Sequence, residues 1–376
     1  MGASNRTRTA IRTDPIMRLT ETRKLEHLNI CLTESVETGS PLFEDVHLVH
    51  QALPEIDLSE IDTSCEFLGK KLDFPLMIAA MTGGHEETKR INDSLAEVAE
   101  KKGIGLGVGS QRAMIENPGL AHTFSVRSVA PSVLLLGNVG ITALKRISPD
   151  RVARAVEAIQ ADGLCVHINP AQEIFQNEGD DDFSGCLAAL ETLCRSVGFP
   201  VVGKEVGNGI SREAAEGLKR AGVRAIDVGG LGGTNWSLID SLRSGRDASQ
   251  YREWGIPTAA AVLEAKGAGL PLIATGGLRN GLHMAKAIAL GADLCGIALP
   301  FLRIVSREGV SGAERFVDGL ERDFRRALFL TGCKNLEELK QTNLVLGARL
   351  KEWVEQRSLD GRRGSETPTA RVNPIR

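Results

Sequence analysis

A cluster of polar side chains that could take part in catalysis follows one short apolar run of the chain. The segment HINPAQE contains His167, Asn169, Gln172 and Glu173. One carboxylate beside amide oxygens suits a Mg²⁺ ion carried in by a phosphate ligand, because Mg²⁺ keeps several waters and rarely occupies an all-protein cage. His167 alone could equally be a hydrogen-bonded core residue. The chain has no carboxylate pair at glycosidase spacing, no GxSxG motif and no P-loop.

Cationic side chains form a second group of candidates. Lys204 lies in the apolar run PVVGKEV, where an isolated ammonium is costly to bury, so it must be paired or functional. Its acidic neighbour in sequence points to the opposite face of a strand, so we predict that Lys204 binds an anionic group of a ligand. Arg23 and Lys24, in TETRKLEHL, are either solvated or fold over an anionic substrate, which Ser110 and Arg112 of GVGSQRA would also face.

Glycine-rich segments supply a third group. Three such segments lie at the ends of apolar runs, namely GGLGGTNW (229–236), TGGLRNG (275–281) and GIALPF (296–301). Ordinary turns would explain one glycine pair, but several glycines after neighbouring strands favour a phosphate site built from backbone N–H groups. The glycines concerned are Gly276, Gly277, Gly281 and Gly296, and Thr234 adds a hydroxyl. His85, after MTGG, is either a helix-start residue or a ligand contact.

These side chains need elements that bring them together, and the chain repeats one suitable unit. A short apolar run ends in Gly and polar residues, and an amphipathic segment such as 91–103, 150–163 or 212–222 follows. Eight such units predict an α/β fold of the (β/α)₈ TIM barrel type with N- and C-terminal extensions, whose chemistry lies on the loops after the strands. An open doubly wound sheet is the alternative, but no strand precedes GxGxxG and a helix. The predicted strands are 74–80, 103–109, 133–138, 163–169, 200–206, 224–229, 271–277 and 292–298.

Composition narrows the class of protein. The 376 residues carry 45 Lys and Arg against 48 Asp and Glu, so a net charge of −3 predicts neither nucleic acid nor membrane as a partner. The seven cysteines form no CxxC pair, which favours buried thiols in the reducing cytoplasm over disulfides or a structural metal. We predict a disordered N-terminal tail over 1–22, one domain over 23–357 and a disordered C-terminal tail over 358–376.

Taken together, these segments resemble one family, the type 2, FMN-dependent isopentenyl-diphosphate isomerases. The resemblance extends in order from about Arg23 to Leu350, and the combination of SQRA, HINPAQE and GGTNW is its most specific part. The segments that carry it are RKLEHL (23–28), FPLMIAAMTGG (74–84), GLGVGSQRA (105–113), GNVG (137–140), HINPAQEIFQNEGD (167–180), VGKEVGNGIS (202–211), DVGGLGGTNW (227–236) and ATGGLRNGLHMAKAIALGADLCGIALPFL (274–302).

The resemblance implies a site for FMN, Mg²⁺ and a diphosphate substrate at the barrel mouth. It places FMN contacts on Ala80, Met81, Thr82, Ser110, Asn138, Lys204, Thr234, Gly277, Leu278, Arg279, Ala298 and Leu299. It places substrate contacts on Arg23, Lys24, Ser110, Gln111, Arg112 and Gln172, with Gln172 and His167 catalytic and Glu173 on the metal. One departure is Gly229, where many members carry serine.

The implied reaction interconverts isopentenyl and dimethylallyl diphosphate by a 1,3-allylic proton shift, with NADPH needed only to reduce FMN. Protonating an unactivated alkene requires a positioned acid and a dry pocket, which reduced flavin could help to supply. The resemblance also implies a homo-oligomer, a tetramer or an octamer. A flavin-dependent 2-hydroxyacid oxidase and a non-catalytic phosphate-binding barrel are the alternatives. The HINPAQE and SQRA segments count against the first, and the convergence of Arg112, Gln172, Glu173 and Lys204 counts against the second.

Overall fold

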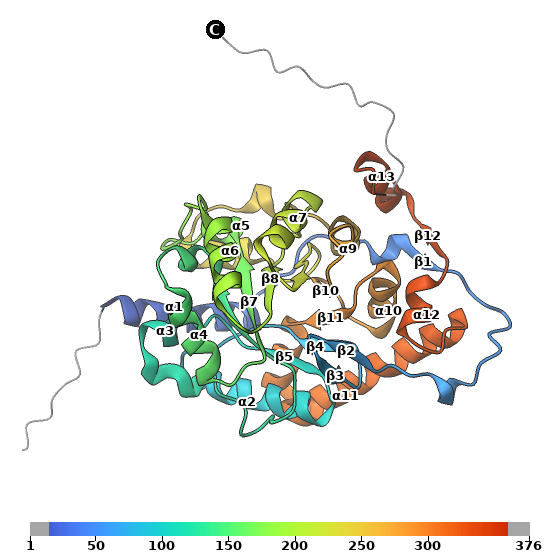
Figure 1. Ribbon diagram of the computed structural model, residues 1–376, viewed down its shortest axis with the longest axis horizontal. Helices are drawn as coiled ribbons and strands as arrows, with labels where there is room; N and C mark the ends of the chain where they lie inside the picture. Colours follow the sequence, from blue (N-terminus) through green and yellow to red (C-terminus); the bar gives the residue numbers. More distant parts are fainter. Residues whose placement is uncertain (1–14, 360–376) are drawn as a thin grey trace, which may run out of the picture.

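The computed structural model describes residues 15–359, and its centre is a closed barrel of eight parallel strands (Figure 1). Hydrogen bonds join the strands in the order β10–β11–β4–β5–β6–β7–β8–β9 around the ring. Each strand overlaps one predicted apolar run, so the predicted (β/α)₈ barrel is confirmed. The strands are β4 (Leu76–Ile78), β5 (Gly105–Gly107), β6 (Leu135–Gly140), β7 (Gly163–Ile168), β8 (Val201–Glu205), β9 (Ala225–Asp227), β10 (Leu272–Thr275) and β11 (Leu294–Ile297).

Helices surround this barrel and cover the outer faces of its strands (Figure 1). The three helices expected from periodicity are present, as α2 (Glu86–Lys101), α4 (Pro149–Ala158) and α7 (Arg212–Ala221). Their ends follow ordinary capping chemistry: the Ser211 side chain accepts from the Ala214 N–H, and Gly222 ends α7 with a left-handed φ of 94°. The remaining outer helices include α6 (Cys186–Ser196), α9 (Thr258–Lys266), α10 (Gly281–Leu290), α11 (Leu299–Thr331) and α12 (Leu336–Gln341).

The barrel interior is filled by alternate residues of its strands. Leu136, Cys165, Val202, Ala225 and Ile273 form one buried apolar cluster, whereas their sequence neighbours pack outward against the helices. Because side chains of a strand alternate between faces, the residue two positions further along each strand also points inward, one layer nearer the carboxyl end. That next layer holds the polar side chains of the site.

Two antiparallel strand pairs lie outside the barrel. β2 (Cys65–Phe67) pairs with β3 (Lys70–Leu72), and Phe67 and Leu72 pack against the interior apolar cluster. The other pair joins distant parts of the chain: β1 (Val46–Leu48) pairs with β12 (Leu344–Leu346), and α13 (Ala348–Gln356) follows.

This second pair fixes the segment around Pro41 and Asp45. The Asp45 carbonyl accepts from Gly347 N–H at 2.6 Å, and its carboxylate accepts from Leu350 N–H at 3.0 Å. A Cβ on Gly232 would lie 2.3 Å from the Pro41 nitrogen, so the same segment packs directly on the glycine-rich loop after β9. The C-terminal part of the chain therefore supports one wall of the barrel mouth.

The N-terminal extension differs from the prediction. Helix α1 (Pro15–Thr33) begins at Pro15 rather than at Arg23, and it contacts α8 (Trp236–Ser244), α3 (Arg112–Glu116) and α11. It therefore lies across the carboxyl end of the barrel, at the left of Figure 1. The rest of the two predicted tails, 1–14 and 360–376, lies outside the described residues.

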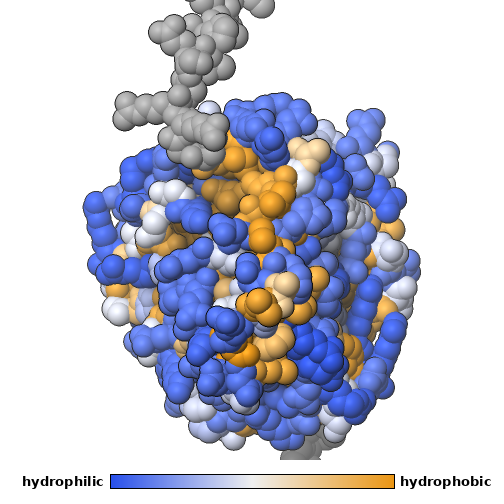
Figure 2. Space-filling view, turned by 90° about the vertical axis from the view of Figure 1, so that its right-hand side faces the viewer, coloured by the Kyte–Doolittle hydropathy of each residue, from blue (hydrophilic) through white to orange (hydrophobic). Residues whose placement is uncertain are grey.

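The surface is mostly hydrophilic. Figure 2, which views the side of the molecule that carries β1, β12 and α12, shows an apolar area in the upper half of this face. Exposed large apolar side chains on these and adjoining elements include Leu330 and Val345. Within residues 15–359, no helix has both the length and the apolar character required to cross a membrane.

Candidate functional site

One cavity at the carboxyl end of the barrel gathers most of the predicted site residues. Loops after the strands form its walls, and α1 contributes to its outer side. The predicted residues that line it are Arg23, Lys24, Ala80, Met81, Thr82, Ser110, Arg112, Asn138, His167, Gln172, Glu173, Lys204, Thr234, Gly277, Arg279, Ala298 and Leu299. The predicted residues Gln111 and Leu278 are not among those that line it.

Gln111 turns away from the cavity into the protein. Its side chain is 1% exposed, its Nε2 donates to the Ala155 carbonyl at 2.8 Å, and its Oε1 accepts from Asn138 N–H at 3.0 Å. The predicted substrate contact by this side chain is therefore not supported by the structure. Instead, the Gln111 side chain links β6 to α4 by hydrogen bonds. Leu278 is likewise buried, in the outer core, and its carbonyl accepts from Arg279.

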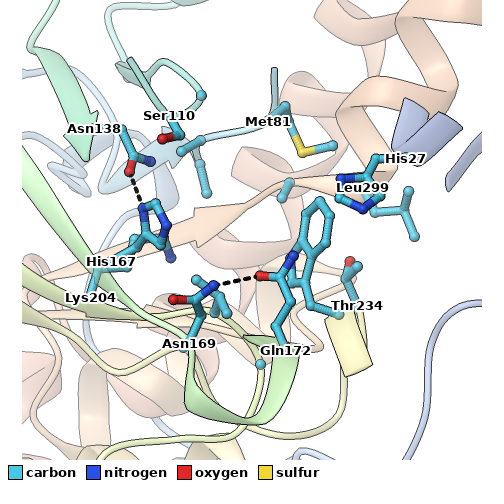
Figure 3. A pocket seen from close by; sticks show the side chains of 18 of the residues that line it. His27, Met81, Ser110, Asn138, His167, Asn169, Gln172, Lys204, Thr234 and Leu299 are labelled. Atoms are coloured by element: carbon cyan, nitrogen blue, oxygen red, sulfur yellow. Dashed lines mark hydrogen bonds between the residues drawn. The ribbon is translucent and has the colours of Figure 1, made fainter. Parts of the chain in front are cut away.

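The floor of the cavity is the polar inner layer of the barrel. Five polar residues form this layer, one on each of the consecutive strands from β6 to β10, and each lies two residues after an interior apolar residue. They are Asn138, His167, Lys204, Asp227 and Thr275. Figure 3 shows Asn138, His167 and Lys204 grouped together. Strand register thus explains why residues far apart in sequence converge here.

His167 is a neutral member of this layer. Its Nδ1 lies 2.7 Å from the Asn138 Oδ1, which as an acceptor requires a proton on Nδ1 (Figure 3). Burial, followed by the charges of Lys204 and Arg23, lowers the pKa of His167 to about 4. The ring is therefore uncharged at neutral pH, with its proton on Nδ1 and its Nε2 able to accept a hydrogen bond.

Lys204 has a partner that sequence reasoning missed. Its Nζ donates to Asp227 Oδ2 at 2.7 Å and to the Glu205 carbonyl at 3.1 Å. Register places Lys204 opposite Asp227 on the neighbouring strand β9. The signal was present in the sequence as a single acidic residue within the apolar run 224–229, but it required knowledge of which strands are neighbours.

The glycine-rich loop after β10 offers backbone donors to an anion. Gly276 and Gly277 have φ of 107° and 75°, and a Cβ on Gly277 would lie 2.5 Å from the Gly232 carbonyl oxygen. Neither of their N–H groups donates a hydrogen bond within residues 15–359. Unused donors beside a cavity fit a phosphate group such as that of FMN.

Two other glycine predictions have different outcomes. Gly296 lines the cavity, whereas a Cβ on Gly281 would lie 2.1 Å from the Leu320 carbonyl oxygen, so Gly281 serves the packing of α10 on α11. At Gly229, φ is 47° and a Cβ would lie 2.1 Å from the Glu205 carbonyl oxygen. No side chain fits this backbone, so a serine contact to FMN has no equivalent here.

His85 caps α2 by accepting from Glu87 N–H at 3.2 Å, which favours its helix-start role.

Cations surround the outer part of the cavity. Lys24 donates to the Ser110 carbonyl at 3.1 Å, and its Nζ lies 4.9 Å from the centre of the Phe124 ring. Burial lowers the pKa of Arg23; Glu178 opposes this shift and Arg112 adds to it. Arg279 pairs with Glu37, and burial lowers the Arg279 pKa to about 10. Glu173 is the only Asp or Glu that lines the cavity within the described part of the chain, so this cavity suits a strongly anionic ligand.

The HINPAQE segment forms a hydrogen-bonded cluster on α5 (Pro170–Glu173). Asn169 Nδ2 donates to Gln172 Oε1 at 3.0 Å (Figure 3) and to Glu173 Oε1 at 2.8 Å. Gln172 Nε2 donates to Asp240 Oδ2 at 2.8 Å. Within residues 15–359, no three His, Cys, Asp or Glu side chains are arranged to hold a metal. Glu173 would be a single protein ligand for a Mg²⁺ ion that arrives with a phosphate.

Helix α1 also brings His27, which was not predicted, to the cavity. His27 Nε2 lies 2.8 Å from Asp240 Oδ1, and Asp240 is completely buried between α1 and α5. The spacing of Arg23 and His27, four residues apart, was the available signal, because it places both on one helix face. Apolar side chains complete this side of the cavity, namely Leu28, Cys31, Met81, Trp236, Leu299 and Leu302.

Comparisons with known proteins identify the family of the chain. A family model described as FMN-dependent dehydrogenase matches residues 141–346. The isopentenyl-diphosphate delta-isomerase of Archaeoglobus fulgidus is 50% identical over 347 residues, which cover 90% of this chain and 99% of that protein. The enzyme of the same name from Pyrococcus abyssi is 46% identical over 351 residues, which cover 89% and 95%.

Solved structures add a comparison of fold. Among them is a mandelate oxidase, 18% identical, with a TM-score of 0.61 and coverage of 88% of this chain and 99% of that one. At this identity the likeness concerns the barrel architecture alone, whereas the likeness to the two isomerases extends through the site-forming segments. On this ground, the chain belongs to the type 2, FMN-dependent isopentenyl-diphosphate delta-isomerase family.

Proposed function

We propose that this protein interconverts isopentenyl and dimethylallyl diphosphate by a 1,3-allylic proton shift, with reduced FMN and Mg²⁺ bound at the barrel mouth. One observation carries the proposal: a single cavity holds unused glycine N–H donors, four arginine and lysine side chains at its sides, and a wall of apolar residues. Such a cavity can hold a flavin phosphate, a diphosphate and a small hydrocarbon group at once. Membership of the isomerase family selects this chemistry among those that a flavin barrel supports.

The diphosphate would be held by the cations of the outer cavity. Arg23 and Arg112 oppose each other electrostatically, and Arg112 is paired in this structure only with Glu116, at 2.8 Å, among the described residues. An anion between them would relieve that repulsion and accept charge-assisted hydrogen bonds. Lys24, Ser110 and a Mg²⁺ ion on Glu173 would complete the anchor. Anchoring at this end positions the alkene without touching its reacting carbons.

The proton transfers need an acid and a base near the hydrocarbon group. A proton is added at the terminal alkene carbon, and another leaves the carbon next to the one that bears the diphosphate. His167 lines the cavity with its Nδ1 on Asn138, and Gln172 is held by Asp240 and Asn169 beside it. Reduced FMN, when bound, supplies a ring nitrogen that can exchange a proton and an electron-rich face. NADPH would serve only as its reductant.

The apolar wall would protect the developing positive charge from water. Leu28, Met81, Trp236 and Leu299 line the cavity near α1, which lies across the mouth. Water at this point would capture a tertiary carbocation-like centre and give an alcohol, so a dry wall is required for clean isomerisation. In this proposal α1 both supplies diphosphate ligands and excludes water.

The test is an absorbance spectrum followed by an anaerobic assay. We expect bound FMN that NADPH bleaches, and isomerisation only when the flavin is reduced and Mg²⁺ is present. Activity that survives complete removal of FMN would refute the flavin role, and activity in excess EDTA would refute the role of Mg²⁺. Consumption of lactate or glycolate by the protein would instead favour a 2-hydroxyacid oxidase.

We also infer that the protein is a homo-oligomer, a tetramer or an octamer. The apolar area in Figure 2, with Leu330 and Val345 exposed on the adjoining elements, supports burial against another copy. Light scattering after size-exclusion chromatography tests this inference. A mass equal to one 40.3 kDa chain would refute it.

A further inference from the structure

The ion pair between Lys204 and Asp227 lies in the polar inner layer of the barrel. Lys204 lines the cavity, whereas Asp227 lies behind it and is 1% exposed. Burying a carboxylate is costly unless the charge is paired and hydrogen-bonded, so the position of Asp227 requires an explanation. Any ligand on the cavity floor would feel both charges, because little solvent screens them.

The carboxylate of Asp227 is fixed on both of its oxygens. Oδ2 accepts from Lys204 Nζ at 2.7 Å, and Oδ1 accepts from the Thr275 hydroxyl and, at 3.3 Å, from Gly229 N–H. These donors come from β8, from β10 and from the loop after β9. Contacts on both oxygens therefore hold the Asp227 carboxylate in one orientation.

Lys204 is fixed in turn and keeps one donor for a ligand. An ammonium group has three N–H donors, and Asp227 and the Glu205 carbonyl take two of them. The third is left for a group in the cavity. Lys204 is thus presented as a hydrogen-bond donor whose positive charge is largely offset from behind.

We propose that Asp227 is a positioning residue that holds the Lys204 ammonium against the flavin ring and offsets its charge, so that bound FMN has a lower reduction potential than Lys204 alone would give it. This inference rests on the proposed function, since it requires FMN on the cavity floor. A positive charge near the ring stabilises the more negative reduced flavin and raises its potential. For a redox-neutral proton transfer, offsetting that charge keeps the reduced ring electron-rich and able to accept a proton.

The test compares reduction potentials of the flavin in variant holoenzymes. Lys204→Gln leaves the Asp227 charge without its partner, and we expect its flavin potential to fall below that of the wild type. Adding Asp227→Asn removes that charge and should return the potential toward the wild-type value. If Asp227 has only a structural role, the single and double variants will have the same potential, which would overturn the inference.

The design avoids an unpaired buried ammonium, which Asp227→Asn alone would create. In Lys204→Gln, the carboxylate keeps the Thr275 and Gly229 donors and can accept from the new amide. If Lys204→Gln does not retain FMN, the flavin reduction potential of the Asp227→Asn holoenzyme is measured at pH 6 instead. A potential above that of the wild type supports the inference, and an unchanged potential overturns it.

A matched control is Asp293→Asn, which removes the same charge at the opposite end of the barrel. Asp293 accepts from Leu272 N–H, at the start of β10, and from Lys340, both at 2.8 Å. We expect its flavin potential to equal that of the wild type; a shift as large as that of Lys204→Gln would overturn the local explanation. A wild-type protein that binds no FMN would overturn the proposed function itself, whereas equal potentials in flavin-containing variants would overturn only this inference.

Discussion

Replacing Gln111 by alanine should cost stability rather than substrate affinity. The change would leave two buried backbone groups, the Asn138 N–H and the Ala155 carbonyl, without their side-chain partner. At about 1–3 kcal/mol for each unsatisfied group, the free energy of unfolding should fall by about 2–6 kcal/mol. The KM for isopentenyl diphosphate should change little, because the side chain does not line the cavity.

Urea unfolding of the FMN-loaded variant, followed by circular dichroism, measures the first effect, and steady-state kinetics under anaerobic conditions measure the second. Gln356→Ala is the matched control, since this exposed glutamine bonds only Glu352 among the described residues and its loss should cost under about 0.5 kcal/mol. A Gln111→Ala variant with wild-type stability and a strongly raised KM would refute the structural role and restore the substrate contact predicted from the sequence.

Three further predictions follow from the site and its surroundings. Arg112→Ala should raise the KM roughly 10- to 100-fold while FMN stays bound, since a charge-assisted hydrogen bond contributes about 1.5–3 kcal/mol; an unchanged KM would contradict its assignment. Gly277→Ala should abolish FMN absorbance in the purified protein, because its Cβ would lie 2.5 Å from the Gly232 carbonyl oxygen; a normal flavin spectrum would count against the phosphate loop. Burial raises the pKa of Glu205 from 4.5 to about 7, although three backbone N–H donors to its carboxylate oppose the shift. The contribution of Glu205 to stability is therefore complete below pH 4.5 and is lost as pH rises through 7. Glu205→Gln should flatten the pH dependence of the urea midpoint, and an unaltered slope would disprove this.

The sequence was most informative where one principle decides the outcome. Eight short runs with apolar residues at nearly every position predicted eight buried parallel strands. The closed barrel brings Lys204, His167 and Arg279, which follow three of these strands, to one cavity. Residues whose role depends on lateral neighbours were harder to assign. Asp227 needed the register between β8 and β9, and Gln111 needed the direction of one side chain at the start of α3. Neither property is encoded in local periodicity.

The start of α1 shows a different limit of sequence reasoning. Residues 1–22 were expected to be a disordered tail, yet the helix begins at Pro15. Tertiary contacts with α8 and α3 account for such a helix better than its own sequence does. The hydrogen bond between His27 and Asp240 is one of these contacts, and it could not be inferred before the two helices were known to be adjacent.

The pairing of β1 with β12 has a consequence for how the holoenzyme is made. β12 and the residues after it hold the segment that contains Pro41, and this segment packs on the glycine-rich loop after β9. A polypeptide still emerging from the ribosome therefore lacks that support until its last segments are released. We therefore expect flavin capture to follow completion of translation. Chains that terminate prematurely before β12 would be colourless and open to proteolysis.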